Sequence, residues 1–289
     1  MSAQSSSTAL QKVEPRFDFG TNWRRFLEGV DEQRIAAAQA SLRDLVGDLT
    51  RASFLDVGSG SGLSSLAAIR LGASSVFSFD FDPECVACTK ELKRRYAPEA
   101  AHWRIECGDA LDSESLRQLG RFQVVYSWGV LHHTGDLWRA LHNVGTLVEP
   151  GGLLVLALYR DQGLESRFWL GVKRVYNRNR LSRAAMVGTF VPAFFARGVV
   201  SDLVRGRNPA QRFREYERHR GMSMFRDWVD WLGGMPFEVA SPEKVATFYR
   251  RRGFELAQVR IAEGSVRNNE YVFRSMKLPH TADADAGLT

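Results

Sequence analysis

The hydrophobic pattern changes between two periods over the stretch from 51 to 160. Short apolar runs that suit buried strands are separated by segments whose apolar positions recur every three or four residues, as in amphipathic helices. This alternation is typical of a parallel sheet with helices on both faces. The expected strands read SFLDV, SSVFSFD, FQVVYSW and LLVLALY, and a proline-glycine turn, EPGG, is expected to introduce the last of them. Sheets of this kind bind ligands at the carboxyl ends of their strands.

The pattern outside this stretch divides the rest of the chain. We expect a tail and covering helices in 1–50, the sheet core in 51–160, a helical lid or substrate insertion in 161–240, a helix and a β-hairpin completing the sheet in 241–279, and a loose tail in 280–289. The two hairpin strands read FELAQVRIA and NEYVFRSMK.

A glycine-rich turn, LDVGSGSG, follows the first expected strand. Asp56 lies at the end of that strand, and Gly58, Ser59, Gly60 and Gly62 follow it. Because glycine has no Cβ, a ligand can approach the backbone of such a turn at the start of the next helix. The spacing differs from the G-x-G-x-x-G of dinucleotide sites, and no lysine follows as in a P-loop. The turn predicts a nucleoside-cofactor site, the alternative being a turn that only closes a strand-helix corner.

Further landmarks follow at the ends of the next strands. The second strand ends at Asp80, a position that suits a carboxylate accepting both ribose hydroxyls. Asp109 follows the third strand in ECGDALD, and Ser127 and Trp128 end the fourth. With the glycine turn, these landmarks resemble, in the same order, the class I S-adenosylmethionine (SAM) dependent methyltransferases.

That resemblance implies a fold, a cofactor and a set of contacts. The fold is α/β, a Rossmann-like seven-stranded sheet in the order 3-2-1-4-5-7-6 with an antiparallel last strand, and the cofactor is SAM, with S-adenosylhomocysteine (SAH) as product. Phe81 is expected against the adenine, Asp109 with Ala110 at its amino group, and Ser127 with Trp128 at the methyl-transfer site. The remaining cofactor-binding residues are Asp56, Gly58, Ser59, Gly60, Gly62 and Asp80.

Three longer segments, FDFGTNW, SWGVLHHTGDLWRAL and RGMSMFRDWVDWLGGMPFEVA, look like those of bacterial small-molecule methyltransferases related to ubiquinone-type O-methylases. The resemblance implies an enzyme of class EC 2.1.1 that methylates a hydroxyl of an aromatic, sugar or lipid-like metabolite by in-line displacement. It also implies a role in secondary metabolism. C- or N-methylation of an anionic or prenyl-type metabolite stays open. So do methylation of RNA or protein, and SAM binding without chemistry.

Candidate catalytic and acceptor residues come from three parts of the chain. His132 and His133 lie just past the fourth strand, and a histidine is well suited to take the proton of a hydroxyl acceptor near neutral pH. Either histidine can instead cap the next helix or pack structurally. Glu270 in the hairpin is a remote candidate base for a carbon acceptor. Asn269 in the hairpin and Trp23 in the N-terminal helices are candidate substrate contacts, with ordinary hairpin chemistry and an aromatic staple as the alternatives.

Two further N-terminal residues, Phe19 and Asn22, are candidates to shape the same pocket, and Asn268 is a candidate beside Asn269.

Composition fits a soluble enzyme. The chain has 289 residues, of which 44% are hydrophobic and 25% charged, enough for one α/β core with an insertion. The N-terminal residues lack a signal-peptide pattern, so a cytoplasmic location is expected. The three cysteines provide no disulfide framework. Although Cys85 and Cys88 form a C-x-x-C, only Cys107 remains as a further thiol, and no metal site is expected.

The positive charge is concentrated in the insertion. The stretch 160–230 has fifteen Lys and Arg against seven Asp and Glu, a net charge of +8 compared with +6 for the whole chain. Solvated helix faces, an anionic small substrate and nucleic acid can each explain this, although nucleic acid is disfavoured because acidic residues alternate with the basic ones. The apolar run 186–200, which contains Pro192 and Arg197, is expected to be too short and too interrupted to span a bilayer. A hydrophobic substrate cavity and contact with a membrane surface both remain open.

Overall fold

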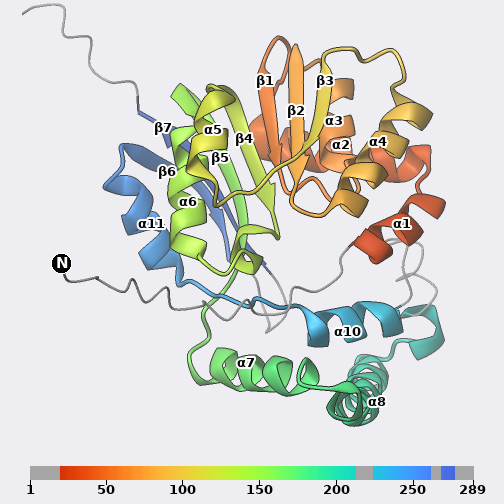
Figure 1. Ribbon diagram of the computed structural model, residues 1–289. Helices are drawn as coiled ribbons and strands as arrows, with labels where there is room; N and C mark the ends of the chain where they lie inside the picture. The colour runs from red at the N-terminus through yellow and green to blue at the C-terminus, as the bar shows by residue number, and fades with distance from the viewer. Residues whose placement is uncertain (1–19, 213–223, 262–267, 277–289) are drawn as a thin grey trace, which may run out of the picture.

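The computed structural model describes residues 20–212, 224–261 and 268–276 (Figure 1). The expected residues Phe19 and the tail 280–289 lie outside these residues, and the side chain of Asn22 is not described.

Seven strands form one sheet in the order β3-β2-β1-β4-β5-β7-β6, which confirms the predicted topology. Strands β1 to β5 pair in parallel, and β7 is antiparallel to both β5 and β6. The bounds are β1 Ser53–Val57, β2 Ser75–Asp80, β3 Trp103–Cys107, β4 Phe122–Trp128, β5 Val148–Tyr159, β6 Phe254–Arg260 and β7 Asn268–Ser275.

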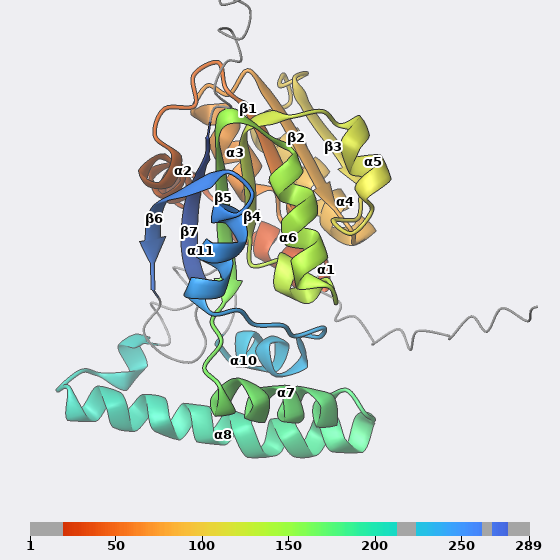
Figure 2. The same cartoon turned by 90° about the vertical axis from the view of Figure 1, so that its left-hand side faces the viewer.

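Helices cover both faces of the sheet, and their apolar stripes supply two separate layers of the core. Residues from α2, α3 and α4 pack on one face, and residues from α5, α6 and α11 pack on the other (Figures 1 and 2). The bounds of the ten helices described are α1 Gly20–Glu28, α2 Glu32–Val46, α3 Leu63–Arg70, α4 Pro83–Tyr96, α5 Ser113–Gln118, α6 Leu137–Thr146, α7 Leu164–Tyr176, α8 Arg180–Val204, α10 Met224–Gly233 and α11 Pro242–Arg250.

The helices begin where the sequence places capping residues. Asp82 accepts a hydrogen bond from the backbone N–H of Glu84 at the start of α4, and Ser241 accepts one from Lys244 at the start of α11. In both helices a proline occupies the first turn, where its missing N–H has no cost. A short 3₁₀ turn, η1 (Leu131–His133), follows β4 and precedes α6.

Helices α7, α8 and α10 form a separate layer beyond the carboxyl ends of the strands (Figures 1 and 2). Their contacts are largely between aromatic rings: Trp169 of α7 lies 4.4 Å from Trp231 of α10 and 5.5 Å from Phe190 of α8, measured between ring centroids. We call this group the aromatic cluster, and its buried members are Val172, Tyr176, Val191 and Leu232. The insertion therefore has a small core of its own.

Two sequence-based expectations need correction. The EPGG turn does not precede β5 but lies within it, because Val148 already pairs with Phe122 and the register then shifts before Leu153. The apolar run 186–200 is part of the longer helix α8, which continues through Pro192. Pro192 lies on the exposed side of α8, where a missing backbone hydrogen bond is tolerated more easily than in the core. By length and composition alone α8 could cross a membrane, which is weak evidence for a span.

Removing the hydroxyl of Tyr249 should weaken the fold. Tyr249 is fully buried in α11, and its hydroxyl donates a 2.8 Å hydrogen bond to the carbonyl of Leu141 in α6. We expect Tyr249→Phe to lower the free energy of unfolding by about 1 kcal/mol, measured by urea denaturation.

The matched control is Tyr96→Phe, because the Tyr96 hydroxyl donates to the carbonyl of Val30 at a half-buried position that water can reach. We expect a smaller loss there. Equal losses in the two variants would show that burial of the Tyr249 bond does not matter.

Candidate cofactor and methyl-transfer site

The glycine turn after β1 is built by backbone hydrogen bonds to the neighbouring strand. The N–H groups of Gly58 and Ser59 both donate to the carbonyl of Phe79 in β2, at 2.8 and 3.1 Å. Gly58, Gly60 and Gly62 have φ values of 77°, 54° and 81°, a left-handed region in which other residues are strained. The turn needs its glycines for this reason alone, before any ligand is considered.

The same glycines let other parts of the chain approach the turn closely. A Cβ on Gly58 would lie 2.4 Å from the side chain of Val130, and one on Gly60 would lie 2.9 Å from the ring of Trp23. The segment after β4 therefore touches the turn from one side, and helix α1 touches it through Trp23. A hydrogen bond from the N–H of Gly20 to Asp82 and an ion pair between Arg24 and Glu84 hold α1 to the start of α4.

Asp80 lies beside the turn at the end of β2. One carboxylate oxygen accepts a 2.9 Å hydrogen bond from the N–H of Gly60, and the other accepts a 3.0 Å bond from the N–H of Asp82. Each oxygen keeps a further lone pair, so the carboxylate can still accept from hydroxyls. Burial raises the pKa of Asp80, although both backbone bonds oppose the rise. The next residue, Phe81, is 54% exposed at the same edge of the sheet.

Asp56 lies underneath the turn rather than on its surface. Its side chain is 2% exposed and accepts a 2.5 Å hydrogen bond from the hydroxyl of Ser65. Ser65 is also 2.7 Å from the hydroxyl of Ser78, which accepts from the indole N–H of Trp103. Burial raises the pKa of Asp56 to about 7. The structure gives Asp56 a role in holding α3, β1 and β2 together, and direct contact with the cofactor stays a prediction.

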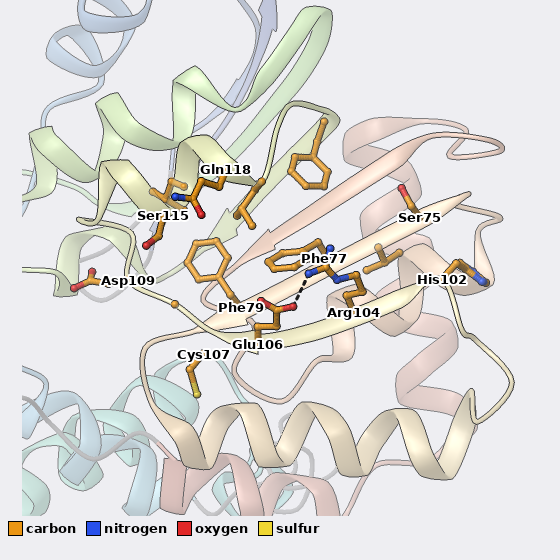
Figure 3. Close-up of a pocket in the computed structure, with 15 residues that line it drawn as sticks. Ser75, Phe77, Phe79, His102, Arg104, Glu106, Cys107, Asp109, Ser115 and Gln118 are labelled. Atoms are coloured by element: carbon orange, nitrogen blue, oxygen red, sulfur yellow. Dashed lines mark hydrogen bonds and ion pairs between the residues drawn. The ribbon is translucent and has the colours of Figure 1, made fainter.

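Asp109, one of the predicted adenine residues, lines a groove of about 570 Å³ along β2, β3 and α5 (Figure 3). Figure 3 shows Asp109 at one end of this groove and the ion pair between Arg104 and Glu106 on its floor. The carboxylate of Asp109 accepts a 2.9 Å hydrogen bond from the N–H of Leu111, and Ala110 beside it is buried. Asp109 therefore lies at the carboxyl edge of the sheet, as the sequence predicts. Its side chain also holds the loop that follows β3, through the bond from Leu111.

The end of β4 is fixed from both sides. Ser127 is buried, and its hydroxyl donates a 3.0 Å hydrogen bond to the carbonyl of Val57, so it joins β4 to β1. Trp128 stacks on Tyr126 with ring centroids 5.7 Å apart. Gly129 then has a φ of 78° and donates its N–H to the carbonyl of Ala157. Ser127 thus has a structural partner, and Trp128 is the more exposed of the two predicted methyl-site residues.

The two histidines lie together in η1 against Tyr159 at the end of β5. His132 is 1% exposed, and its ring centroid is 3.9 Å from that of Tyr159. The Nδ1 atom of His132 accepts a 3.4 Å bond from the N–H of Tyr159, which places the proton on Nε2, and Nε2 has no partner among the described residues. Burial, and the charges of His133 and Lys173, lower the pKa of His132 well below its usual value.

His133 has the opposite tautomer. Its Nδ1 atom donates a 2.6 Å hydrogen bond to the carbonyl of Pro236, which places the lone pair on Nε2. Burial lowers the pKa of His133 to about 4, the bond to Pro236 opposes the fall, and the charge of Lys173 adds to it. His133 is therefore neutral at pH 7 and has a nitrogen that can accept a proton.

Lys173 of α7 belongs to the same region, and the sequence analysis missed it. It is fully buried, its ammonium group donates to the carbonyl of Trp231, and the group lies 4.6 Å from the ring of Trp231 and 4.9 Å from that of Phe237. Burial lowers its pKa to about 7. A signal was available, because Lys173 follows Trp169 by four residues and so lies on the apolar stripe of its helix.

The hairpin candidates Asn269 and Glu270 pair with Leu158 and Ala157 of β5. Glu270 pairs with Arg260 at 3.6 Å, and Arg260 also pairs with Asp44 of α2; burial raises the pKa of Glu270. Asn269 is fully buried and donates to the hydroxyl of Tyr271 at 3.2 Å. Roles for Glu270 and Asn269 in the reaction stay predictions without a contact that supports them.

Asn268 has a better position for contact with a substrate than Glu270 or Asn269 has. Its side-chain oxygen is buried without a partner among the described residues, and its amide nitrogen is 3.3 Å from where a Cβ on Gly129 would lie. No group of three or more metal-ligating residues is found in the described part of the chain.

A methyltransferase-domain family matches residues 30–231, which is more than half of the chain. The chain belongs to the class I SAM-dependent methyltransferases. SAM is the cofactor of this family, and the glycine turn with the Asp80 carboxylate beside it fits such a nucleoside. The methyltransferase is 31% identical over 148 residues to a ribosomal protein L11 methyltransferase of Citrifermentans bemidjiense, a match covering 50% of this chain and 44% of that protein.

A second relative is a ubiquinone biosynthesis O-methyltransferase of Xanthomonas oryzae pv. oryzae, 34% identical over 110 residues, covering 38% of this chain and 44% of that protein. The methyltransferase thus spans less than half the length of these curated relatives. Among solved structures, magnesium protoporphyrin IX methyltransferase from Synechocystis PCC 6803 with bound SAH is similar, with a TM-score of 0.52 at 13% identity, covering 88% of this chain and 94% of that one. At this identity the likeness concerns the fold alone.

Asp56 should make the stability of the methyltransferase depend on pH. Its pKa is about 7 in the folded chain and near 4 when unfolded, so the folded state holds the extra proton between these values and stability falls as the pH rises through them. Asp56 should make the free energy of unfolding fall by up to about 1.4 kcal/mol per pH unit in this range. We expect Asp56→Asn, which keeps an acceptor for Ser65, to abolish that contribution. Urea denaturation of both proteins across that range measures the difference.

The control is Asp48→Asn. Hydrogen bonds from Thr50 lower the pKa of this exposed carboxylate, so above about pH 5 it is ionised in both states and its replacement should leave the slope unchanged there. An unchanged slope in Asp56→Asn would contradict the shifted pKa.

Asp80→Ala should weaken SAM binding. The substitution removes the carboxylate expected to accept two ribose hydroxyls, each in a charge-assisted bond of roughly 1.5–3 kcal/mol. We expect the dissociation constant for SAM in calorimetry to rise by about a hundredfold or more. Asp48→Ala is the control for loss of a carboxylate elsewhere, and circular dichroism checks the fold. Unchanged affinity in Asp80→Ala would refute the ribose assignment.

Proposed function

We propose that this methyltransferase transfers the methyl group of SAM to a hydroxyl of a small aromatic, sugar or lipid-like metabolite. The observation that carries the proposal is the state of His133. Its Nδ1–H is held by the carbonyl of Pro236, which leaves a neutral imidazole with Nε2 as proton acceptor next to the end of β4. A hydroxyl acceptor needs such a group, whereas an amine does not.

When bound, SAM supplies an activated methyl group on a sulfonium. The chain's own residues then have three tasks: they orient the acceptor oxygen, exclude water and remove the hydroxyl proton. In this proposal Nε2 of His133 receives that proton. The low pKa of His133 keeps it in the free-base form at neutral pH, at the expense of base strength. The Nε2–H of His132, for which the described part of the chain supplies no acceptor, is a donor that can bind a second oxygen of the acceptor.

The surroundings of the histidines support an apolar body for the acceptor. Phe237 lies 5.4 Å from Tyr159 between ring centroids, and through Lys173 and Trp231 it connects the histidines to the aromatic cluster. Aromatic and apolar side chains with a few directed polar groups are typical of small-molecule sites. The buried indole N–H of Trp169, which has no partner among the described residues, adds one such donor.

A labelling experiment tests the proposal. Purified protein is incubated with SAM carrying a deuterated methyl group and a host-cell extract, which is then separated into small molecules, RNA and protein. We expect the label in the small-molecule fraction, with a loss of about a hundredfold or more in its rate of appearance for His133→Gln. Calorimetry should give unchanged SAM affinity for this variant, since the residues expected to hold SAM are those of the glycine turn and Asp80 rather than His133.

His142→Gln is the control, because His142 is exposed on α6. Label in RNA or in protein would refute a small-molecule acceptor. Full activity of His133→Gln would refute the hydroxyl-base role and favour an amine acceptor.

A further inference from the structure

Helix α8 exposes an unusually apolar outer face. Leu181 is 82% exposed, Val200 58%, Leu203 62% and Val204 82%, and Leu164 at the start of α7 is 80% exposed. Between them the exposed positions of α8 are mostly alanine, glycine and proline. A helix on the surface of a soluble protein normally presents polar residues outward, so a continuous apolar outer face indicates a surface that contacts something apolar.

The exposed charges of α8 have one sign, whereas Glu165 is an exposed acidic residue beside Leu164 at the start of α7. Arg180, Arg183 and Arg197 are exposed on α8, and Arg205 and Arg207 follow its end. No acidic side chain is exposed on α8, because its one acidic residue, Asp202, is buried and bonded to Arg212 through both oxygens at 2.5 Å. An apolar face bordered by arginine matches a surface with an apolar interior and a negatively charged outer layer.

The inner face of α8 shows that the helix lies along this surface rather than crossing it. Phe194 packs against Trp228 of α10 at 5.8 Å and against Trp169 of α7 at 6.0 Å, so α8 is part of a folded layer. The charge-free part of α8 is 184–196, which is shorter than the roughly 20 apolar residues of a span. Crossing a membrane would require α8 to leave the aromatic cluster.

The position of α8 in the molecule supports the same conclusion. Figures 1 and 2 show α7 and α8 as the layer farthest from the sheet, with α10 between them and the carboxyl ends of the strands. The outer face of this layer therefore points away from the rest of the described chain. Contact through it leaves the glycine turn and the histidines in place behind α10.

We propose that the outer face of α7 and α8 binds the surface of a lipid bilayer that contains anionic phospholipids. Leu181, Val200, Leu203 and Val204 enter the boundary between headgroups and acyl chains, and the arginines bind lipid phosphates. The methyltransferase is then a peripheral membrane protein, and an acceptor dissolved in the bilayer is available next to its insertion. The binding does not depend on the proposed hydroxyl chemistry.

Vesicle flotation tests this proposal with the full-length protein. Vesicles of phosphatidylcholine with phosphatidylglycerol are compared with vesicles of phosphatidylcholine alone. We expect flotation with the anionic vesicles, weakened by high salt because the arginine contribution is screened. The double variant Leu181→Glu/Val204→Glu should reduce the bound fraction about tenfold or more, since it puts two negative charges on the face. Both side chains are 82% exposed, so the fold should tolerate the change.

The matched control is Leu256→Glu/Val259→Glu, which places the same charges at partly exposed apolar positions of β6. It should float like the wild type, and SAM affinity in calorimetry should be equal in all three proteins. Absence of flotation, or equal flotation of both double variants, would overturn the proposal. Resistance of the bound protein to alkaline carbonate would also overturn it, in favour of a span. A dimer in solution that the α8 variant dissociates would show that a second copy covers the face.

Discussion

The hydrogen bond from the N–H of Gly60 to the carboxylate of Asp80 joins the two strand ends on which the cofactor site depends. It fixes the glycine turn against β2, and it does so with an oxygen that still has a lone pair for a ligand. Below it, the buried series from Asp56 through Ser65 and Ser78 to Trp103 holds the same two strands from inside the core. Above it, Trp23 covers Gly60. The turn is thus fixed on three sides before any cofactor binds.

The region around the two histidines, where we propose that the acceptor binds, is organised differently. There the polar groups come from separate segments: the histidines from η1, Pro236 from the segment before α11, and Lys173 from α7. Burial disfavours the charged forms of Lys173 and both histidines, and keeping these groups beside one another in an apolar environment costs stability that the aromatic cluster must offset. Such a concentration of shifted pKa values is more typical of functional sites than of structural cores.

The sequence was informative where a local pattern dictates backbone geometry. The glycine turn, the position of Asp80 and the order of the strands follow from short motifs and periodicity, and the structure has all three. It was less informative where a role depends on distant partners. Asp56 was predicted to bind the cofactor, and the sequence did not show that Ser65, nine residues later, binds its side chain inside the core. For Asn269, predicted as a substrate contact, no local pattern indicated that strand register places it at a buried position beside Tyr271. For Lys173 the helical spacing from Trp169 was a local signal of burial, but its partners Trp231 and Phe237 lie about sixty residues further on and could not be read from the sequence.

The contrast between the two sides has a consequence for how such an enzyme changes over time. Around the glycine turn, contacts are made by backbone groups and by space that only glycine leaves, so few substitutions are permitted there. In the aromatic cluster, contacts are ring against ring at 4.4 to 6.1 Å, and apolar side chains of similar volume can replace one another at modest cost. Under the proposed function, substitutions in the aromatic cluster would change which acceptor is bound, while the glycine turn that fits SAM stays the same.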